Sequence, residues 1–245
     1  MSLGMFCGIP LPFHIWDEEL VSVMVASLPL VGLLIGAVWW AAGLLLTALN
    51  LPLMLAAACL ALIPFVAAGF IHLDGFMDTS DAHLSRRNPE DKLRILKDPT
   101  VGAFAVIMLV IIVLLQFAAM YTVAENAKYL ALLISTCVLS RSCSALSVLV
   151  LRHIPGSNYA AMIAKTKSSK GKVFAVGAAA AAVVLSFLYA GVSGLIVSAA
   201  VVLGYAAAMR VVYKSFKGVS GDLLGYSMVI GELCGIIALS VLQAV

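Results

Sequence analysis

The feature that most limits the fold of this 245-residue chain is a series of long apolar stretches. Each of them approaches the roughly 20 residues that a helix needs to cross the hydrocarbon core of a bilayer. The chain is 63% hydrophobic and 11% charged, which is too apolar for an ordinary water-soluble enzyme of its size. We therefore predict one all-α, polytopic membrane domain over residues 1–245, with about seven transmembrane helices. The spans are placed at about residues 29–49, 52–71, 101–123, 129–151, 172–190, 194–212 and 222–244.

Two local signals refine this pattern. Acidic residues open the stretch Asp17–Ser27 and Pro29 follows it, which favours a short interfacial helix leading into the first span. Pro64 falls inside the second span and is expected to kink it. A kink of this kind is tolerated where neighbouring helices satisfy the carbonyl group that proline leaves without a donor.

Basic residues collect in three of the loops between the predicted spans. Five follow the second span, five the fourth and three the sixth, so thirteen of the fifteen lysines and arginines fall on one side of the membrane. By the positive-inside rule this side is cytoplasmic, which puts the amino terminus inside and the carboxyl terminus outside. The thirteen are Arg86, Arg87, Lys92, Arg94, Lys97, Arg152, Lys165, Lys167, Lys170, Lys172, Arg210, Lys214 and Lys217.

The first basic loop, residues 79–100, contains a predicted short helix. Asn88 is a suitable N-cap, Pro89 a suitable first helical residue, and two acids follow in the first turn. Apolar and basic residues then alternate at a helical period until Lys97. We expect this helix to lie on the membrane surface with its apolar face down. Its basic face suits either a phosphorylated substrate or anionic lipid headgroups.

The segment 72–81 is the strongest chemical signal, because Asp74, Asp78 and Asp81 lie within eight residues directly after an apolar stretch. On a helix, at about 100° per residue, the three carboxylates project from one face. They would repel one another unless a cation lay between them, and Mg²⁺ favours such oxygen ligands, usually together with substrate phosphates. The alternative is a solvated acidic face at a helix end. The sequence favours metal-assisted phosphoryl chemistry at the membrane surface.

A second polar group lies near the carboxyl terminus. Asp222 opens the last span, where an acid can simply complement the helix dipole. Glu232 follows nearly three turns deeper, where an unpaired carboxylate is costly and needs a partner or a polar cavity. Arg141, inside the fourth span, is the candidate counter-charge. A purely structural pair and a role in the site are equally open for these two residues.

The run of residues 68–102, AGFIHLDGFMDTSDAHLSRRNPEDKLRILKDPTVG, resembles the signature region of the cobalamin synthase family, the membrane adenosylcobinamide-GDP ribazoletransferases. The string H-L-D-G-x-x-D-T-x-D is the specific part of this resemblance, and a departure from the family's frequent pattern is visible at residues 70–71, just before the histidine. The resemblance covers most of the chain in the same order. Its other parts are Leu11-Pro12, Leu28–Gly36, the stretch SRSCSAL around Arg141, Arg152-His153 and Gly221–Leu233.

The resemblance implies a reaction. Members of the family join adenosylcobinamide-GDP to α-ribazole, or to its 5′-phosphate, and release GMP in a Mg²⁺-dependent phosphoryl transfer. It implies that Asp74 and Asp78 hold the metal, with Asp81 as a further ligand. One carboxylate or His72 would accept the hydroxyl proton. His72 is equally suited to orienting Asp74.

The resemblance also implies which residues bind the substrates, in a cytoplasm-facing bowl roofed by the loop Arg152–Lys172. Phosphate contacts are expected from basic residues, and further metal or hydroxyl contacts from acids. Contacts deeper in the membrane are expected from the two charged residues inside the spans. These candidates are Arg86, Arg87, Lys97, Asp98, Asp222, Arg141 and Glu232.

Two other classes of protein remain as alternatives. A CDP-alcohol phosphotransferase carries D-x-x-D-G-x-x-A-R, and this chain lacks the A-R pair. A transporter would spread polar residues through several spans, whereas here they cluster at one edge. We expect a multi-pass protein of the inner (cytoplasmic) cell membrane with its site facing the cytoplasm, in contact with lipid and its substrates and not with nucleic acid. Self-association into a homo-oligomer is left open.

Overall fold

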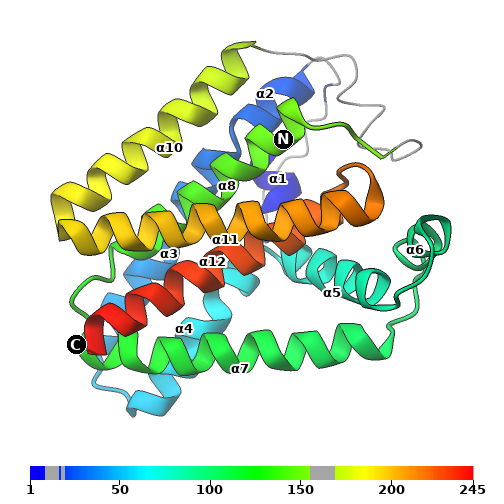
Figure 1. Ribbon diagram of the computed structural model, residues 1–245. Coiled ribbons are helices and arrows are strands. Elements are labelled where there is room, and N and C mark those ends of the chain that lie inside the picture. Colours follow the sequence, from blue (N-terminus) through cyan, green and yellow to red (C-terminus); the bar gives the residue numbers. More distant parts are fainter. Residues whose placement is uncertain (9–16, 18–19, 155–168, 245) are drawn as a thin grey trace.

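The computed structural model describes residues 1–8, 17, 20–154 and 169–244 (Figure 1). In this part of the chain the regular elements are helices, joined by short connections. The helices are α1 (Ser2–Phe6), α2 (Val21–Ala26), α3 (Leu28–Ala48), α4 (Leu53–Ala67), α5 (Ile71–Leu84), α6 (Pro89–Ile95), α7 (Ala103–Asn126), α8 (Leu132–Val150), α10 (Ser169–Ala190), α11 (Val192–Phe216) and α12 (Gly221–Ala244).

Six of these helices, α3, α7, α8, α10, α11 and α12, are long and apolar enough to cross a membrane, and α4 and α5 together form a seventh, bent candidate. Their bounds lie within a few residues of the predicted spans. The all-α, multi-pass architecture predicted from the sequence is therefore confirmed. The second span, predicted at about 52–71, differs from the others, because α4 ends at Ala67 and the chain bends sharply before α5.

The second span breaks between α4 and α5, which meet at an angle of 90°. Gly69 and Phe70 both have left-handed backbone conformations, with φ of 65° and 59°. Their N–H groups donate to the carbonyl oxygens of Val66 and Phe65 at 2.9 and 2.8 Å, which is the Schellman arrangement that ends a helix. The chain turns here because glycine adopts the left-handed region without steric cost.

Pro64, in contrast, lies inside α4 without ending it. Proline has no N–H, so the carbonyl of Leu60, four residues earlier, loses its helical donor. The indole Nε1 of Trp39 on α3 donates to this oxygen at 2.8 Å, deep in the bundle. A neighbouring helix thus satisfies the carbonyl group, as expected for proline in a membrane span.

The helices α8 and α12 form the centre of the bundle. In their most apolar stretches 67% and 61% of the residues are buried, compared with 17% in α10. The outer helices instead expose large apolar side chains, such as Val173 and Leu188 on α10. These outward faces suit contact with lipid rather than water, since so much apolar surface would be unfavourable in water.

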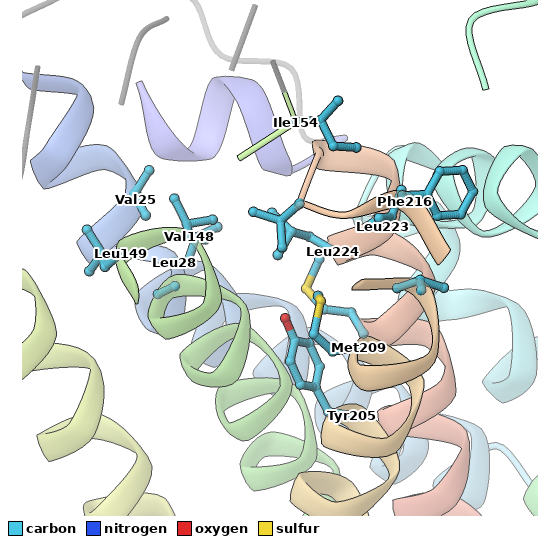
Figure 2. Packing of buried hydrophobic residues seen from close by; sticks show 14 of the residues in the cluster. Val25, Leu28, Val148, Leu149, Ile154, Tyr205, Met209, Phe216, Leu223 and Leu224 are labelled. Carbon is cyan, nitrogen blue, oxygen red and sulfur yellow. The ribbon is translucent and has the colours of Figure 1, made fainter. Parts of the chain in front are cut away.

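The largest buried cluster joins α8, α11, α12 and the short helix α2 (Figure 2). Figure 2 shows Tyr205 of α11 directing its hydroxyl group toward α8, where it donates to the Ser147 hydroxyl at 3.0 Å. The helix α2 contributes Val21 and Val25, both fully buried. A short helix before the first span was predicted, but it packs into the protein core through these residues instead of lying only at the interface.

The three basic segments meet at one end of the bundle. The chain after α8 pairs with the α11–α12 connection, since Ile154 N–H donates to Val219 O at 3.1 Å. The Lys92 ammonium of α6 donates to Ser215 Oγ at the end of α11 at 2.7 Å. Figure 1 shows these segments at the end opposite the carboxyl terminus. This clustering agrees with the predicted charge distribution, while the side of the membrane stays a prediction.

The predicted start of α6 is confirmed. Asn88 caps the helix, its side-chain oxygen accepting the Asp91 N–H at 2.9 Å, and Pro89 occupies the first turn. The apolar side of α6 packs on the protein core through the buried Leu96 and its neighbour Leu93. That face was expected to lie on the membrane, so this part of the prediction is corrected.

Candidate active site

The acidic segment forms the helix α5, as predicted. Asp74 lies in its first turn, and Asp78 and Asp81 follow about one and two turns later. Asp74 is exposed, whereas Asp78 and Asp81 are half-buried. Asp78 is near enough to both neighbours, and to Asp222, for their charges to interact. The structure therefore gathers four carboxylates from α5 and the start of α12.

Two glycines allow α5 and α12 to approach closely. A Cβ atom at Gly75 would lie 2.8 Å from Asp222 Cα, and one at Gly225 would lie 3.0 Å from the backbone oxygen of His72. Each glycine therefore leaves room for the backbone of the other helix. This crossing, between residues far apart in the sequence, carries Asp222 to the acidic face of α5.

Asp81 has a different neighbour from the other acids. Its carboxylate lies against Gly102, the residue before α7, where an added Cβ atom would overlap both carboxylate oxygens. The amino terminus of a helix is a favourable place for a negative charge. Asp81 therefore lies beside the amino terminus of α7, which distinguishes its surroundings from those of Asp74 and Asp78.

The donor chemistry of this cluster fits Mg²⁺, which takes oxygen ligands. Within the described residues, however, no three His, Cys, Asp or Glu side chains lie close enough to hold one ion jointly. Mg²⁺ usually uses only one or two protein carboxylates, completed by water and substrate phosphates. Pairs such as Asp74 with Asp78 meet that requirement. The ligand set of Asp74, Asp78 and Asp81 stays a prediction.

A cavity of about 190 Å³ lies beside the acids, between α1, α5, α8 and α12. Asp74 and Asp222 line it together with His72 and Ser144, and the rest of its wall is largely apolar. His72 is buried, and its Nε2 has no hydrogen-bond partner among the described residues. His72 therefore does not orient Asp74 through this atom, which leaves Nε2 available to a bound molecule.

Arg141 and Glu232 form an ion pair inside the bundle, as the sequence indicated. Ser140 adds to this group, since its hydroxyl donates to Glu232 Oε1 at 2.6 Å. Both charged side chains are buried. Gly32 of α3 lets α8 approach, because a Cβ atom there would lie 2.9 Å from Arg141 Cδ. The pair binds α8 to α12 below the acidic cluster.

The remaining predicted site residues lie on the exposed surface. Arg86 and Arg87 follow α5, and Lys97 and Asp98 follow α6. No hydrogen bond or ion pair joins them to the acidic cluster in the described part of the chain. The Thr100 hydroxyl and N–H donate to Asp98 at 2.5 and 2.9 Å, which lowers the pKa of Asp98 from its ordinary value. Asp98 thus has a local partner of its own.

Two features of the site region were not predicted. Ser215 at the end of α11 contacts both Lys92 of α6 and the ring of His83, at 2.7 and 3.2 Å, and so fixes α6 against the bundle. Ser144 of α8 lines the cavity beside His72. The sequence did contain a sign of this position, because Ser144 lies one helical turn after Arg141 in a helix whose polar residues recur at a 3.6-residue period. Most of the predicted roof, Arg152–Lys172, lies outside the described residues.

Comparisons with known proteins agree over nearly the whole chain. The model of the family described as Cobalamin-5-phosphate synthase matches residues 1–240. A protein of Clostridium perfringens named adenosylcobinamide-GDP ribazoletransferase is 37% identical over 242 residues, which are 99% of this chain and 96% of that protein.

Further proteins carry the same name. One from Clostridium botulinum is 37% identical over 236 residues, 96% of this chain and 94% of its own length. One from Pseudomonas fluorescens is 41% identical over 107 residues, 43% of each chain. No solved structure matches the chain.

Proposed function

Because the chain belongs to the cobalamin-5-phosphate synthase family, we propose that it transfers the cobinamide-phosphate group of adenosylcobinamide-GDP to α-ribazole or α-ribazole 5′-phosphate. One observation supports this activity most directly. Asp74 and Asp222, from opposite ends of the chain, line a single cavity together with a buried histidine that has a free nitrogen. Carboxylates and a possible proton acceptor thus line the same cavity in which a substrate group can bind.

The proposed step is a phosphoryl transfer in line. The oxygen of a ribose hydroxyl that is free in both α-ribazole and its 5′-phosphate attacks the phosphorus atom that carries the cobinamide group. A new bond forms between them while the bond from that phosphorus to the oxygen shared with GMP breaks. GMP leaves with the shared oxygen, and the proton of the attacking hydroxyl passes to a base on the protein. The product is adenosylcobalamin, or its phosphate when the acceptor is α-ribazole 5′-phosphate.

Asp74 and Asp78, with Asp81 further along α5, are proposed to hold Mg²⁺. When bound, the ion supplies positive charge that stabilises the pyrophosphate oxygens during transfer. Asp222 lies near enough to Asp78 for their charges to interact, and so adds to the negative charge around the proposed ion. A carboxylate of this group or His72 Nε2 takes the hydroxyl proton.

Arg86, Arg87 and Lys97 are proposed to contact the phosphates or the guanosine side of the donor. Their exposure at the end of the bundle that carries the other basic residues supports this role. We assign that end to the cytoplasmic face of the inner membrane, because the positive-inside rule places such loops there. The deep charges Arg141 and Glu232 neutralise each other, which does not favour a transport path.

The activity is tested with purified protein in detergent or in nanodiscs. Adenosylcobinamide-GDP, α-ribazole and Mg²⁺ should give GMP and adenosylcobalamin in equal amounts. Replacing α-ribazole with its 5′-phosphate measures the preferred acceptor, and chelation of Mg²⁺ should stop the reaction. Release of CMP from a CDP-alcohol donor, without reaction of the cobinamide substrate, would instead assign the chain to the lipid-type phosphotransferases.

A further inference from the structure

The cavity beside the acidic cluster has an unusual combination of walls. At about 190 Å³ it is smaller than the roughly 300–1,000 Å³ of sites that enclose whole drug-sized ligands. Phe6, Leu28 and Met228 make part of it apolar, while His72 and Ser144 supply polar side chains. Such a space fits one flat apolar ring system carrying few polar atoms, and excludes a corrin ring.

Ser144 differs from the other serines of its helix. The structure describes all of α8, and four of its five serines donate to a carbonyl oxygen three or four residues earlier. Among the described residues the Ser144 hydroxyl has no hydrogen-bond partner, although Ser144 is only 1% exposed. The Tyr205 hydroxyl lies near both Ser144 and Ser147, and it donates its proton to Ser147. A buried hydroxyl without a partner is costly, which indicates that a ligand completes it.

His72 repeats this pattern on the facing helix. Its Nε2 is buried and has no hydrogen-bond partner in the part of the chain that the structure describes, and its side chain lines the same cavity two residues before Asp74. Two incomplete polar groups in one apolar cavity are difficult to explain by packing alone, because each one lowers stability. The cost of burying the two groups is removed when a bound molecule offers polar atoms that pair with them.

Building on the proposed function, we infer that this cavity binds the base of the acceptor nucleoside, with the Ser144 hydroxyl donating to the ring nitrogen that does not carry the ribose. A benzimidazole has one such acceptor nitrogen and is otherwise apolar, which matches the cavity wall. A guanine base has several donors and acceptors, and most of them would stay unpaired here. With the base so placed, the ribose extends toward Asp74 and Asp222 on the cavity wall, and His72 faces its hydroxyl groups.

The first test removes the hydroxyl. Ser144→Ala should raise both the KM and the calorimetric Kd for α-ribazole about 3- to 10-fold, the usual worth of one neutral hydrogen bond. The KM for adenosylcobinamide-GDP should not change. Ser142→Ala is the matched control, since Ser142 is equally buried on the same helix but already donates to Val138 O at 2.8 Å. Melting temperatures of both variants show whether they fold.

The second test removes the partner atom from the ligand. An indole riboside, in which C–H replaces the acceptor nitrogen, should bind the unaltered protein about 3- to 10-fold more weakly than α-ribazole. It should bind Ser144→Ala no more weakly than α-ribazole does. Equal losses in both proteins, or a change in the donor KM instead, would overturn the inference.

These measurements separate the inference from the proposed function. Calorimetry uses α-ribazole alone and needs no turnover. Binding that depends on Ser144 without any transfer would support the cavity assignment and refute the activity. Transfer that is indifferent to Ser144→Ala, or the absence of α-ribazole binding, would refute the cavity assignment.

Discussion

The guanidinium group of Arg141 on α8 lies against the carboxylate of Glu232 on α12, and both are shielded from solvent. The two charges come from helices that are 91 residues apart in sequence at this point. An ion pair of this kind costs desolvation energy, so its net stabilisation is small, but losing one partner leaves the other charge alone in a low dielectric. That asymmetry makes the pair testable.

Arg141→Met and Glu232→Gln should each destabilise the detergent-solubilised protein by roughly 3–5 kcal/mol. The double variant should recover much of this loss, because neither charge is then left alone. A double-mutant cycle on melting temperatures measures the coupling. Turnover of the double variant decides the second question, since a stable but inactive protein would show that the pair also serves the site. Additive losses would mean that the two residues do not stabilise each other.

Replacing Asp74 or Asp78 by Asn keeps the shape of the side chain and removes its charge. Each change should lower turnover by about 10²–10³-fold, as is typical when one electrostatic contact to the transition state is lost. Asp81→Asn should have a milder effect on turnover, because Asp81 packs beside Gly102 at the start of α7. Initial rates at saturating Mg²⁺ measure this order. Near-normal activity of Asp78→Asn would contradict the acidic-face model.

Gly75→Ala tests the close approach of α5 and α12 without removing a chemical group. The new Cβ atom would meet backbone atoms of Asp222 at 2.8–3.0 Å, so the helices must separate. A misplacement near 1 Å can cost about 10²-fold in rate, and we expect a loss of that order. Gly177→Ala on α10 is the control, since nothing lies within 4 Å of its added carbon. Equal activity of the two variants would show that the helix crossing does not position the site.

Trp39→Phe removes the donor to the Leu60 carbonyl and should cost about 1–3 kcal/mol of stability. In a Pro64→Ala background the new backbone N–H can donate to the same oxygen, so the cost of Trp39→Phe should be smaller there. Melting temperatures of the four proteins measure this coupling. Trp40→Phe, in the neighbouring half-buried tryptophan, should have little effect in either background.

The orientation in the membrane can be tested with two exposed glutamates. In a background without the native cysteines, Glu90→Cys on α6 should react in intact cells only with a membrane-permeant reagent. Glu125→Cys, near the opposite end of the bundle, should react with an impermeant one. These outcomes follow from the positive-inside rule. The reverse pattern would invert the topology and move the proposed site to the outer face.

Most of the fold could be predicted because its determinants are local. Apolar length identified the spans, and Asn88 with Pro89 identified the start of α6, since capping depends on adjacent residues. The break after α4 was missed although Gly69 was a usable sign of a helix end. Pro64 drew the expectation of a kink instead, and the Leu60 carbonyl that it leaves without a helical donor is satisfied by a hydrogen bond from α3.

The candidate site was predictable only in part. The three acids of α5 follow from helical spacing, and the pairing of Arg141 with Glu232 follows from the cost of a lone buried charge. The approach of Asp222 depends on how α12 crosses α5, which no local pattern records. Ser144 was missed because it stands out only by lacking a hydrogen-bond partner among the described residues. That lack can be seen only once the helices are packed.

The broken second span also bears on how the protein enters the membrane during synthesis. The 15 residues of α4 reach only about 22 Å, less than the roughly 30 Å of the hydrocarbon core, and α5 carries three carboxylates. This segment is therefore a weak insertion signal when it leaves the ribosome. We expect it to be drawn into the bilayer by α3 and later by α7, so the part of the chain that bears the acids reaches its final depth only after α7 has entered.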